Sequence, residues 1–315
     1  MKKNIFLSSE ITAPEYAEQC SQDKALFHVI PVPFEASVSY GAGTAHGPAA
    51  ILEASDQLEL WDGASIPAEL GIYTAPPVKC SGKTTKVLSR IEKATHKALD
   101  CKAIPVILGG EHTVTYGALR ALKDRRAQDS IGNKPSFGVV QFDAHADLRD
   151  TYEDTKWSHA CVMRRAVSTS DTDPDGLSLQ LAQFGVRAMG LDELAFRKTA
   201  PVTHWDAAHL ARLQEQGKVP KKLLPADFPK DIYITFDVDG LDPSIMPATG
   251  TPVPGGIGWY ETLSLLEKIV AGRRVIGFDV VELAPIDEKA GGHAWNFTAA
   301  RLVYAIMGII QRNAK

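Results

Sequence analysis

The sequence predicts an α/β fold, a three-layer α/β/α sandwich built around a central parallel sheet. Continuous apolar runs rich in Val and Ile alternate along the chain with amphipathic segments of helical period. Strands that are apolar at every position indicate a sheet covered by helices on both faces. No repeat, low-complexity tract or linker divides the 315 residues. We therefore expect a single domain over residues 1–315, with residues 1–24 as an N-terminal extension.

Six segments are predicted to be strands because each is a short apolar run. In chain order they are Leu26–Val32, Ile104–Leu108, Ser136–Phe142, Leu179–Val186, Asp231–Phe236 and Arg274–Val281. Two further segments, Ser65–Lys83 and Thr169–Gly176, are rich in turn-forming residues and are predicted to be irregular.

Helices are predicted between these strands from the spacing of apolar side chains. The first opens at Gly47-Pro48, where proline at the first position loses no hydrogen bond. In the helix over Tyr260–Ala271, for example, Leu263, Leu266 and Val270 share one face. The remaining predicted helices are Lys86–Leu99, Thr113–Leu122, Asp206–Gln216 and Ala299–Gln311.

Composition argues against nucleic-acid and membrane partners. The net charge is −4 and the basic residues are scattered, which does not favour a nucleic-acid surface. The longest apolar run, Leu302–Ile310, is too short to cross a membrane. The apolar stretch Ile5–Leu7 is too short for a signal peptide. None of the four cysteines forms a C-x-x-C pair, so we expect free thiols and a cytoplasmic protein.

Three clusters of acidic residues and histidine each follow a predicted strand. They are GGEHT at 109–113, DAHAD at 143–147 and DVDGLDP at 237–243. Ligand sites of open parallel sheets form in the crevice beyond the carboxyl ends of the strands. The sequence therefore predicts one site to which all three clusters contribute.

Six side chains in these clusters form a candidate metal-ligand set. Residues i and i+2 of an extended segment point the same way, so Asp143, His145 and Asp147 can converge, as can Asp237 and Asp239. His112 brings the set to four carboxylates and two imidazoles. A single Asp after a strand is usually a cap or turn former. Four such carboxylates together are costly to bury without cations, so we expect two divalent ions, with Mn²⁺ suiting oxygen-rich ligands better than Zn²⁺.

Five motifs carry a resemblance to a known family. GGEHT, FDAHADLRD, SHA, FDVDGLDPSIMPATGTPVPGG and GFDVVELAP occur in this order. From about Gly41 to its C-terminus the chain resembles the ureohydrolase superfamily of arginases and agmatinases. The resemblance implies an arginase-like fold with eight parallel strands, two Mn²⁺ per chain, and a homotrimer or homohexamer.

The resemblance also implies how the ligands divide between the ions. One manganese would be bound by His112, Asp143, Asp147 and Asp237. The other would be bound by Asp143, His145, Asp237 and Asp239. Asp143 and Asp237 would then bridge the two ions.

Three residues are implied to be catalytic: Asp147, His159 and Glu282. In the family's reaction a metal-bridging hydroxide attacks the guanidinium carbon of the substrate. Glu282 would bind that guanidinium, since a carboxylate can accept two parallel hydrogen bonds from it. His159 would contact substrate and shuttle protons, because its pKa lies near neutral, although it could equally be a loop histidine without a role. Asp147 would pass a proton to the leaving amine.

The segment LRDTYEDTKWSHA at 148–160 resembles the agmatinase branch, which implies hydrolysis of agmatine to putrescine and urea. Asp150 and Glu153 could attract the amine tail of agmatine or could be solvated charges. Guanidinobutyrate, aminopropylagmatine and arginine remain alternative substrates. A non-catalytic metal-bound paralogue and a single-zinc amide deacetylase are the rival classes. No role is assigned to His293 or Cys161.

Overall fold

The computed structural model describes residues 5–129, 137–287, 289 and 291–314, which form a three-layer α/β/α sandwich. Its centre is one sheet in the order β2-β1-β3-β8-β7-β4-β5-β6, and every neighbouring pair is parallel. The strands are β1 Phe27–Val32, β2 Ile72–Thr74, β3 Ile104–Gly109, β4 Gly138–Phe142, β5 Gln180–Phe184, β6 Val202–Trp205, β7 Asp231–Asp237 and β8 Arg274–Val281.

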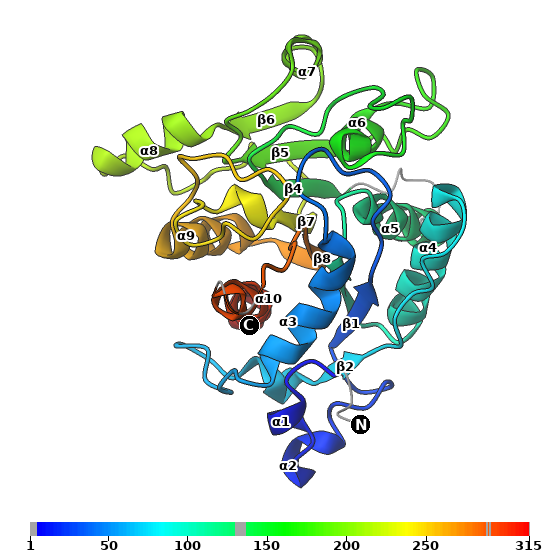
Figure 1. Cartoon of the computed structure of the whole chain (residues 1–315), viewed down its shortest axis with the longest axis vertical. Coiled ribbons are helices and arrows are strands. Elements are labelled where there is room, and N and C mark those ends of the chain that lie inside the picture. The colour runs from blue at the N-terminus through cyan, green and yellow to red at the C-terminus, as the bar shows by residue number, and fades with distance from the viewer. Residues whose placement is uncertain (1–4, 130–136, 288, 290, 315) are drawn as a thin grey trace.

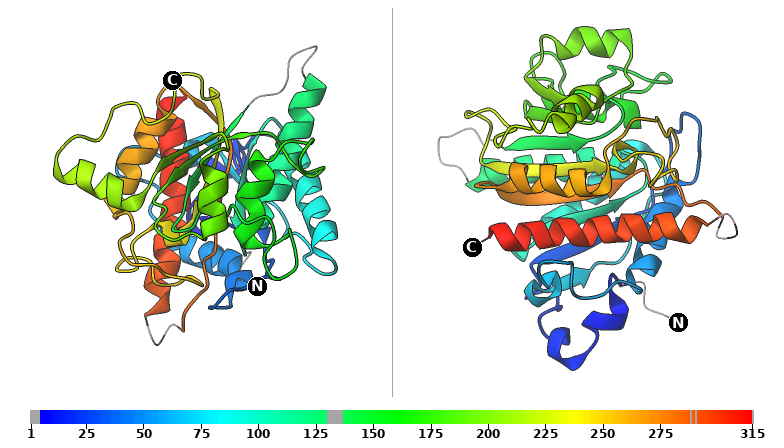
Figure 2. Two further views of the ribbon diagram at one scale, coloured as in Figure 1. Left: turned by 90° about the horizontal axis from the view of Figure 1, so that it is seen from above. Right: turned by 90° about the vertical axis from the view of Figure 1, so that its left-hand side faces the viewer.

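Helices cover both faces of the sheet (Figures 1 and 2). They are α1 Ser8–Ile11, α2 Pro14–Ala17, α3 Gly47–Ser55, α4 Thr84–Asp100, α5 Val114–Asp129, α6 Val162–Val167, α7 Leu191–Arg197, α8 Ala207–Glu215, α9 Trp259–Val270 and α10 Gly292–Asn313. One apolar cluster joins the sheet to α3, α8, α9 and α10, and a second joins it to α4, α5 and α6. The sheet is therefore buried on both faces, as its continuous apolar strands predict.

The six predicted strands are confirmed, except that Ser136 lies outside the described residues. The pattern missed β2 and β6, the two edges of the sheet. β2 has three residues and lies inside the segment 65–83 that was predicted to be irregular. β6 has no fully buried residue, so it lacks the apolar run that marks a central strand. The eight strands implied by the family resemblance are present.

The predicted helices are also present, most with ends shifted by one to three residues. Two extend further than expected: α5 continues to Asp129, and α10 begins at Gly292 rather than Ala299. The prediction of irregular structure over 169–176 is confirmed. The short helices α1, α2, α6 and α7 were not predicted, because they offer too few turns to display a helical period.

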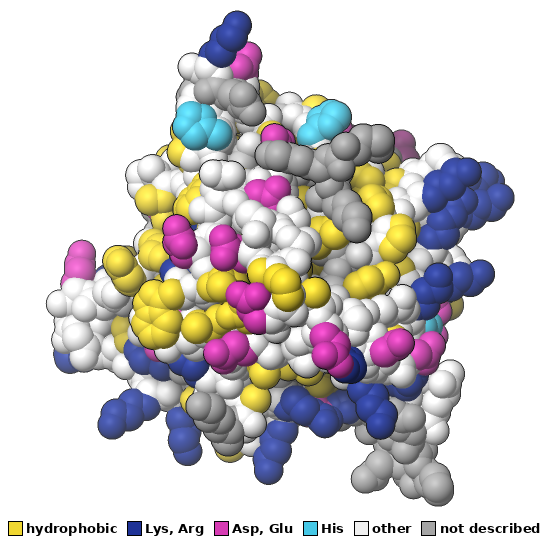
Figure 3. Space-filling model, turned by 90° about the horizontal axis from the view of Figure 1, so that it is seen from below, with side chains coloured by type: hydrophobic (Ala, Val, Ile, Leu, Met, Phe, Trp, Pro, Cys, Tyr) yellow, Lys and Arg dark blue, Asp and Glu magenta, His cyan; other side chains and the backbone are white. Residues whose placement is uncertain are grey.

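The N-terminal segment packs against the body of the molecule. Phe6 and Leu7 are fully buried in the core, and the backbone N–H of Leu7 donates to Ser55 Oγ over 2.8 Å. Figure 3 shows the face that includes α1 and α2, where apolar and acidic side chains mix over the middle and Lys and Arg gather toward the rim. Across the described residues, no helix has the length and apolar character needed to cross a membrane.

Sheet topology brings the three clusters together. β3, β8, β7 and β4 are consecutive in the sheet, so their carboxyl ends lie side by side. Phe142 at the end of β4 is in register with Phe236 of β7, and the two rings stack 5.0 Å apart. The residues that follow, Asp143 and Asp237, are thereby placed next to each other although 94 positions apart in the sequence.

Candidate metal centre and active site

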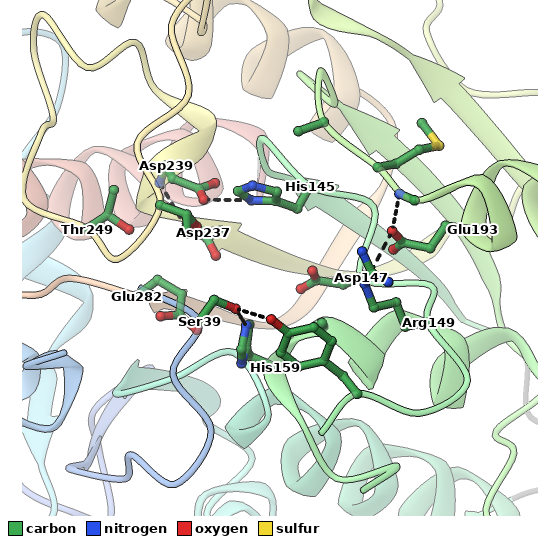
Figure 4. Close-up of a pocket in the computed structure, with 16 residues that line it drawn as sticks. Ser39, His145, Asp147, Arg149, His159, Glu193, Asp237, Asp239, Thr249 and Glu282 are labelled. Atoms are coloured by element: carbon green, nitrogen blue, oxygen red, sulfur yellow. Dashed lines mark hydrogen bonds and ion pairs between the residues drawn. The ribbon is translucent and has the colours of Figure 1, made fainter. Parts of the chain in front are cut away.

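The six predicted metal ligands converge at the carboxyl ends of β3, β4 and β7. Figure 4 shows four of them, His145, Asp147, Asp237 and Asp239. His112 follows β3 and lies on one side of the group. Its Nδ1 is 2.9 Å from Asp147 Oδ2, 3.2 Å from Asp143 Oδ2 and 3.5 Å from Asp237 Oδ2. The imidazole therefore points at three carboxylates that come from two other strands.

His145 occupies the other side of the group. Its Nδ1 is 2.9 Å from Asp239 Oδ2 and 3.7 Å from Asp143 Oδ1. Two sets of three ligand atoms could each hold a cation, namely His112 with Asp143 and Asp147, and Asp143 with His145 and Asp239. Because Asp143 belongs to both sets, the site offers two adjacent positions that share one carboxylate.

Burial makes this arrangement costly unless cations fill it. Asp143, Asp237 and Asp239 are at most 4% exposed. Burial, followed by repulsion from Asp143, raises the pKa of Asp147 to about 7. Burial and the neighbouring charges of Asp239 and Asp143 raise the pKa of Asp237 well above its usual value. Four crowded carboxylates fit a pair of divalent ions, whose charge of +4 would balance them.

The hydrogen bonds around His112 fix which of its nitrogens faces the site. Thr235 Oγ1 donates to Asp279 Oδ1 over 2.7 Å, so it must accept from His112 Nε2–H, 2.8 Å away. In the neutral imidazole Nδ1 then carries the lone pair, and this buried atom has no hydrogen-bond partner among the described residues. A buried lone pair facing three carboxylates is what a metal ligand requires.

Several polar residues behind the ligands were missed by the sequence analysis. Asp279 is fully buried and accepts hydroxyl hydrogen bonds from Thr115, Tyr233 and Thr235. Gln141 Nε2 donates to Asp143 Oδ2 over 2.7 Å. The available signal was a polar side chain inside a strand that is otherwise apolar on both faces, since such a group must find a partner.

Glu282 follows β8 and lines the same cavity. Its Oε1 accepts the backbone N–H of His112 over 2.6 Å, which ties the carboxylate to the metal-ligand loop. The residue has a φ of 64°, a left-handed backbone that is costly for a side chain other than Gly, Asn or Asp. Such strain at a site residue is typical of positions where side-chain direction matters. Burial, and then the charge of Glu111, raises the pKa of Glu282 well above its usual value.

The cavity has a volume of about 320 Å³. Four of the metal ligands and Glu282 line it, together with polar side chains from three loops and from helix α7: Ser39, Arg149, Tyr152, His159, Glu193, Thr249 and Thr251. The sequence analysis missed Glu193, whose carboxylate accepts the N–H groups of Leu148 and Gly190 at 2.9 and 2.6 Å. Glu193 belongs to the helix α7, which is too short to show a helical spacing of apolar residues in the sequence.

The remaining candidate residues fall into two groups. His159 lines the cavity, and burial lowers its pKa to about 4, so the ring is neutral at neutral pH. Asp150 and Glu153 do not line it: Asp150 is exposed and pairs with Arg165, and Glu153 is exposed. The structure therefore does not bring the two carboxylates expected at the substrate tail into the cavity.

Cys161 and His293, to which the sequence assigns no role, do not line the cavity. Cys161 is fully buried, and burial raises the pKa of its thiol to about 12, which makes it a poor nucleophile. His293 is exposed in the first turn of α10.

Comparison with known proteins identifies relatives over nearly the whole chain. The sequence model of the Arginase family matches residues 25–308. An N(1)-aminopropylagmatine ureohydrolase of Synechocystis is 37% identical over 294 residues, covering 89% of this chain and 87% of that protein. An agmatinase of Pyrococcus horikoshii is 30% identical over 290 residues, covering 90% and 92%. The crystal structure of an agmatine ureohydrolase of Thermoplasma volcanium superposes with a TM-score of 0.72 at 26% identity, covering 93% and 92% of the two chains.

Proposed function

The chain belongs to the arginase family, and from this premise we propose that it cleaves the guanidinium group of an agmatine-type substrate into urea and a free amine with the help of two Mn²⁺ ions. One observation supports this most strongly. Two ligand sets that share Asp143 adjoin one cavity, which Asp147 from the first set and His145 and Asp239 from the second line together with Glu282. That combination provides a place for two cations and, beside it, a partner for a guanidinium group.

The names of the relatives bear on the substrate. The relative at 37% identity is named for N(1)-aminopropylagmatine, and the relative at 30% is named for agmatine. We therefore propose N(1)-aminopropylagmatine as the preferred substrate and agmatine as the second candidate. Both carry the same guanidinium group, so the chemistry at the metal site is the same for either.

His112, Asp143 and Asp147 would hold one ion, and Asp143, His145 and Asp239 the other. Asp237 Oδ2, 3.5 Å from His112 Nδ1, would contribute to the same centre. Bound there, the metal pair would supply a nucleophilic water that ionises near neutral pH. Mn²⁺ suits four carboxylates without thiolates, whereas Zn²⁺ sites more often use Cys and His.

The chain's own residues would orient the substrate and move protons. The Glu282 carboxylate would receive the planar guanidinium, and the positive charge of that group would favour the ionised carboxylate. The His112 N–H bond to Oε1 fixes the direction of this carboxylate before substrate arrives. Asp147, beside the nucleophile, would hand a proton to the leaving amine nitrogen, and His159 Nε2 would exchange protons with that amine.

A urea-release assay tests the proposal. The Mn²⁺-loaded protein is offered N(1)-aminopropylagmatine, agmatine, guanidinobutyrate and arginine. We expect the highest kcat/KM with the first, lower values with agmatine, and no urea after chelation. Urea from none of the four would favour a non-catalytic metal-binding protein, and a content of one metal per chain would favour a single-metal hydrolase instead.

The proposal also covers the compartment in which the enzyme works and its oligomeric state. We propose that it works in the cytoplasm, which agrees with four free cysteines. We also propose a homotrimer or homohexamer. Light scattering on the purified protein tests the assembly, and a monomer would contradict it.

A further inference from the structure

His159 is held between two serine hydroxyls from the loop that follows β1. Its Nδ1 lies 3.1 Å from Ser37 Oγ, and its Nε2 lies 2.9 Å from Ser39 Oγ. Ser37 is buried, whereas Ser39 is exposed and lines the cavity, as Figure 4 shows. The two ring nitrogens therefore meet different surroundings: Nδ1 faces the interior of the protein, and Nε2 is on the cavity side.

Ser37 is in turn fixed by a buried carboxylate. Glu111 is 1% exposed, and its Oε2 accepts the backbone N–H groups of Ala36 and Ser37, both at 2.6 Å. Its Oε1 lies 3.1 Å from Ser37 Oγ. The Ser37 hydroxyl donates to this oxygen, so Glu111 holds both the backbone and the side chain of Ser37.

The direction of the hydrogen bond between Ser37 and His159 follows from this. A hydroxyl has one proton, and that of Ser37 is already given to Glu111. Ser37 Oγ can therefore only accept from His159, through Nδ1–H at 3.1 Å and the backbone N–H at 3.2 Å. The three groups form a chain from carboxylate to hydroxyl to imidazole that turns Nδ1 toward Ser37. On the other side of the ring, Ser39 Oγ donates to the Tyr152 hydroxyl over 3.2 Å and lies 2.9 Å from Nε2. The serine contacts therefore fix the direction of the ring.

We propose that Ser37, oriented by Glu111, is a positioning residue that fixes the direction of the His159 ring, with Nδ1 toward the interior and Nε2 toward the cavity. Nε2 is then the nitrogen that meets the substrate. During turnover Nε2 takes up one proton from solvent water and gives it to the amine that Asp147 has already helped to release, so that the product leaves as an ammonium ion. The inference rests on the proposed function, since His159 needs a defined ring direction only if it exchanges protons with substrate.

A second serine near the ring provides a matched control. Ser158 Oγ lies 3.3 Å from His159 Nδ1 and is also buried, but no hydrogen bond links it to a carboxylate within the described part of the chain. Ser158→Ala removes the same group near the same nitrogen as Ser37→Ala does. Only Ser37→Ala breaks the chain of hydrogen bonds to Glu111.

The experiment first measures urea release by the wild-type enzyme, which tests the proposed function on its own. It then measures kcat, KM and manganese content of Ser37→Ala, Ser37→Thr, Ser158→Ala, His159→Ala and the double variant Ser37→Ala/His159→Ala. We expect Ser37→Ala to lower kcat by about tenfold to a hundredfold. This is only part of the rate factor that general acid–base catalysis contributes, because the variant keeps His159 itself. KM and manganese content should stay near wild-type values, Ser37→Thr should recover most of the rate, and Ser158→Ala should change little.

The double variant separates positioning from general structural damage. If Ser37 acts through His159, removing Ser37 from the His159→Ala enzyme lowers kcat no further. An equal loss in both backgrounds, an effect confined to KM, or an equal effect of Ser158→Ala would overturn the inference and leave the proposed function standing. A wild-type enzyme without urea release on any guanidino substrate would overturn both. If Ser37→Ala fails to fold, Glu111→Gln is compared in the same two backgrounds and must show the same dependence on His159.

Discussion

Thr235→Val should weaken one of the two metal positions and leave the other nearly unchanged. Thr235 Oγ1 accepts from His112 Nε2–H at 2.8 Å and donates to Asp279 at 2.7 Å, so it sets the orientation and tautomer of this imidazole. Valine has nearly the same shape but no hydroxyl. The substitution leaves a buried N–H and one oxygen of Asp279 without this partner, at a cost of about 1–3 kcal/mol for an unsatisfied buried group.

The loss should appear as weaker metal binding on the His112 side. Removing an outer partner of a metal-binding histidine typically lowers affinity by about tenfold to a hundredfold, which is about 1.4–2.8 kcal/mol. The position built on His145 and Asp239 has no contact with Thr235 and should keep its affinity. Thr235→Ser, which retains the hydroxyl, is the matched control.

Calorimetric titration of the metal-free protein with Mn²⁺ measures this directly, because the two positions should appear as two binding steps. We expect one step to weaken in Thr235→Val and both to stay unchanged in Thr235→Ser. Two unchanged steps in the valine variant would refute the reasoning, and equal weakening of both would show that the effect is general destabilisation rather than loss of one imidazole's orientation.

Three further predictions follow from the site. Glu282→Gln should keep both metals but lower kcat/KM for urea release by about a thousandfold, since the neutral amide cannot pair with the guanidinium; an active variant would remove Glu282 from the mechanism. In the metal-free protein the pKa of Asp147 is raised from 3.8 to about 7, so its contribution to stability is complete below pH 3.8 and is lost as pH rises through 7. Melting curves after chelation should therefore show falling stability over that range, with a larger gain from Mn²⁺ at pH 8 than at pH 5; a pH-independent gain would contradict this. Gly41→Ala places a Cβ 3.0 Å from Gly250 Cα and O, where two loops meet near the cavity, and should raise KM more than it lowers kcat; a variant with unchanged KM would show that the loops can shift freely.

The sequence predicted the central strands and the convergence of the metal ligands for the same physical reason. A strand buried on both faces must be apolar throughout, and a polar cluster directly after it must lie at the sheet's carboxyl edge. β3, β4, β7 and β8 satisfy both conditions, so Asp143 and Asp237 could be placed together before the structure was known.

The parts that were missed lack such a pattern. β2 and β6 are short edge strands in which Ile72 alone is fully buried, so no apolar run marks them. Asp279 and Glu193 take their importance from partners distant in sequence, which only the folded chain reveals. Asp150 was expected near the substrate because it follows the metal-binding segment, but its pairing with Arg165 turns it away from the cavity.

The central claim is that two cations occupy the cavity and share Asp143. A crystal structure of the Mn²⁺-loaded protein, with anomalous scattering measured at the manganese edge, tests this most directly. The account predicts two peaks about 3.5–4 Å apart, with His112 beside one, His145 beside the other and an oxygen of Asp143 near each. A single peak, or a pair of peaks that Asp143 does not contact, would contradict it.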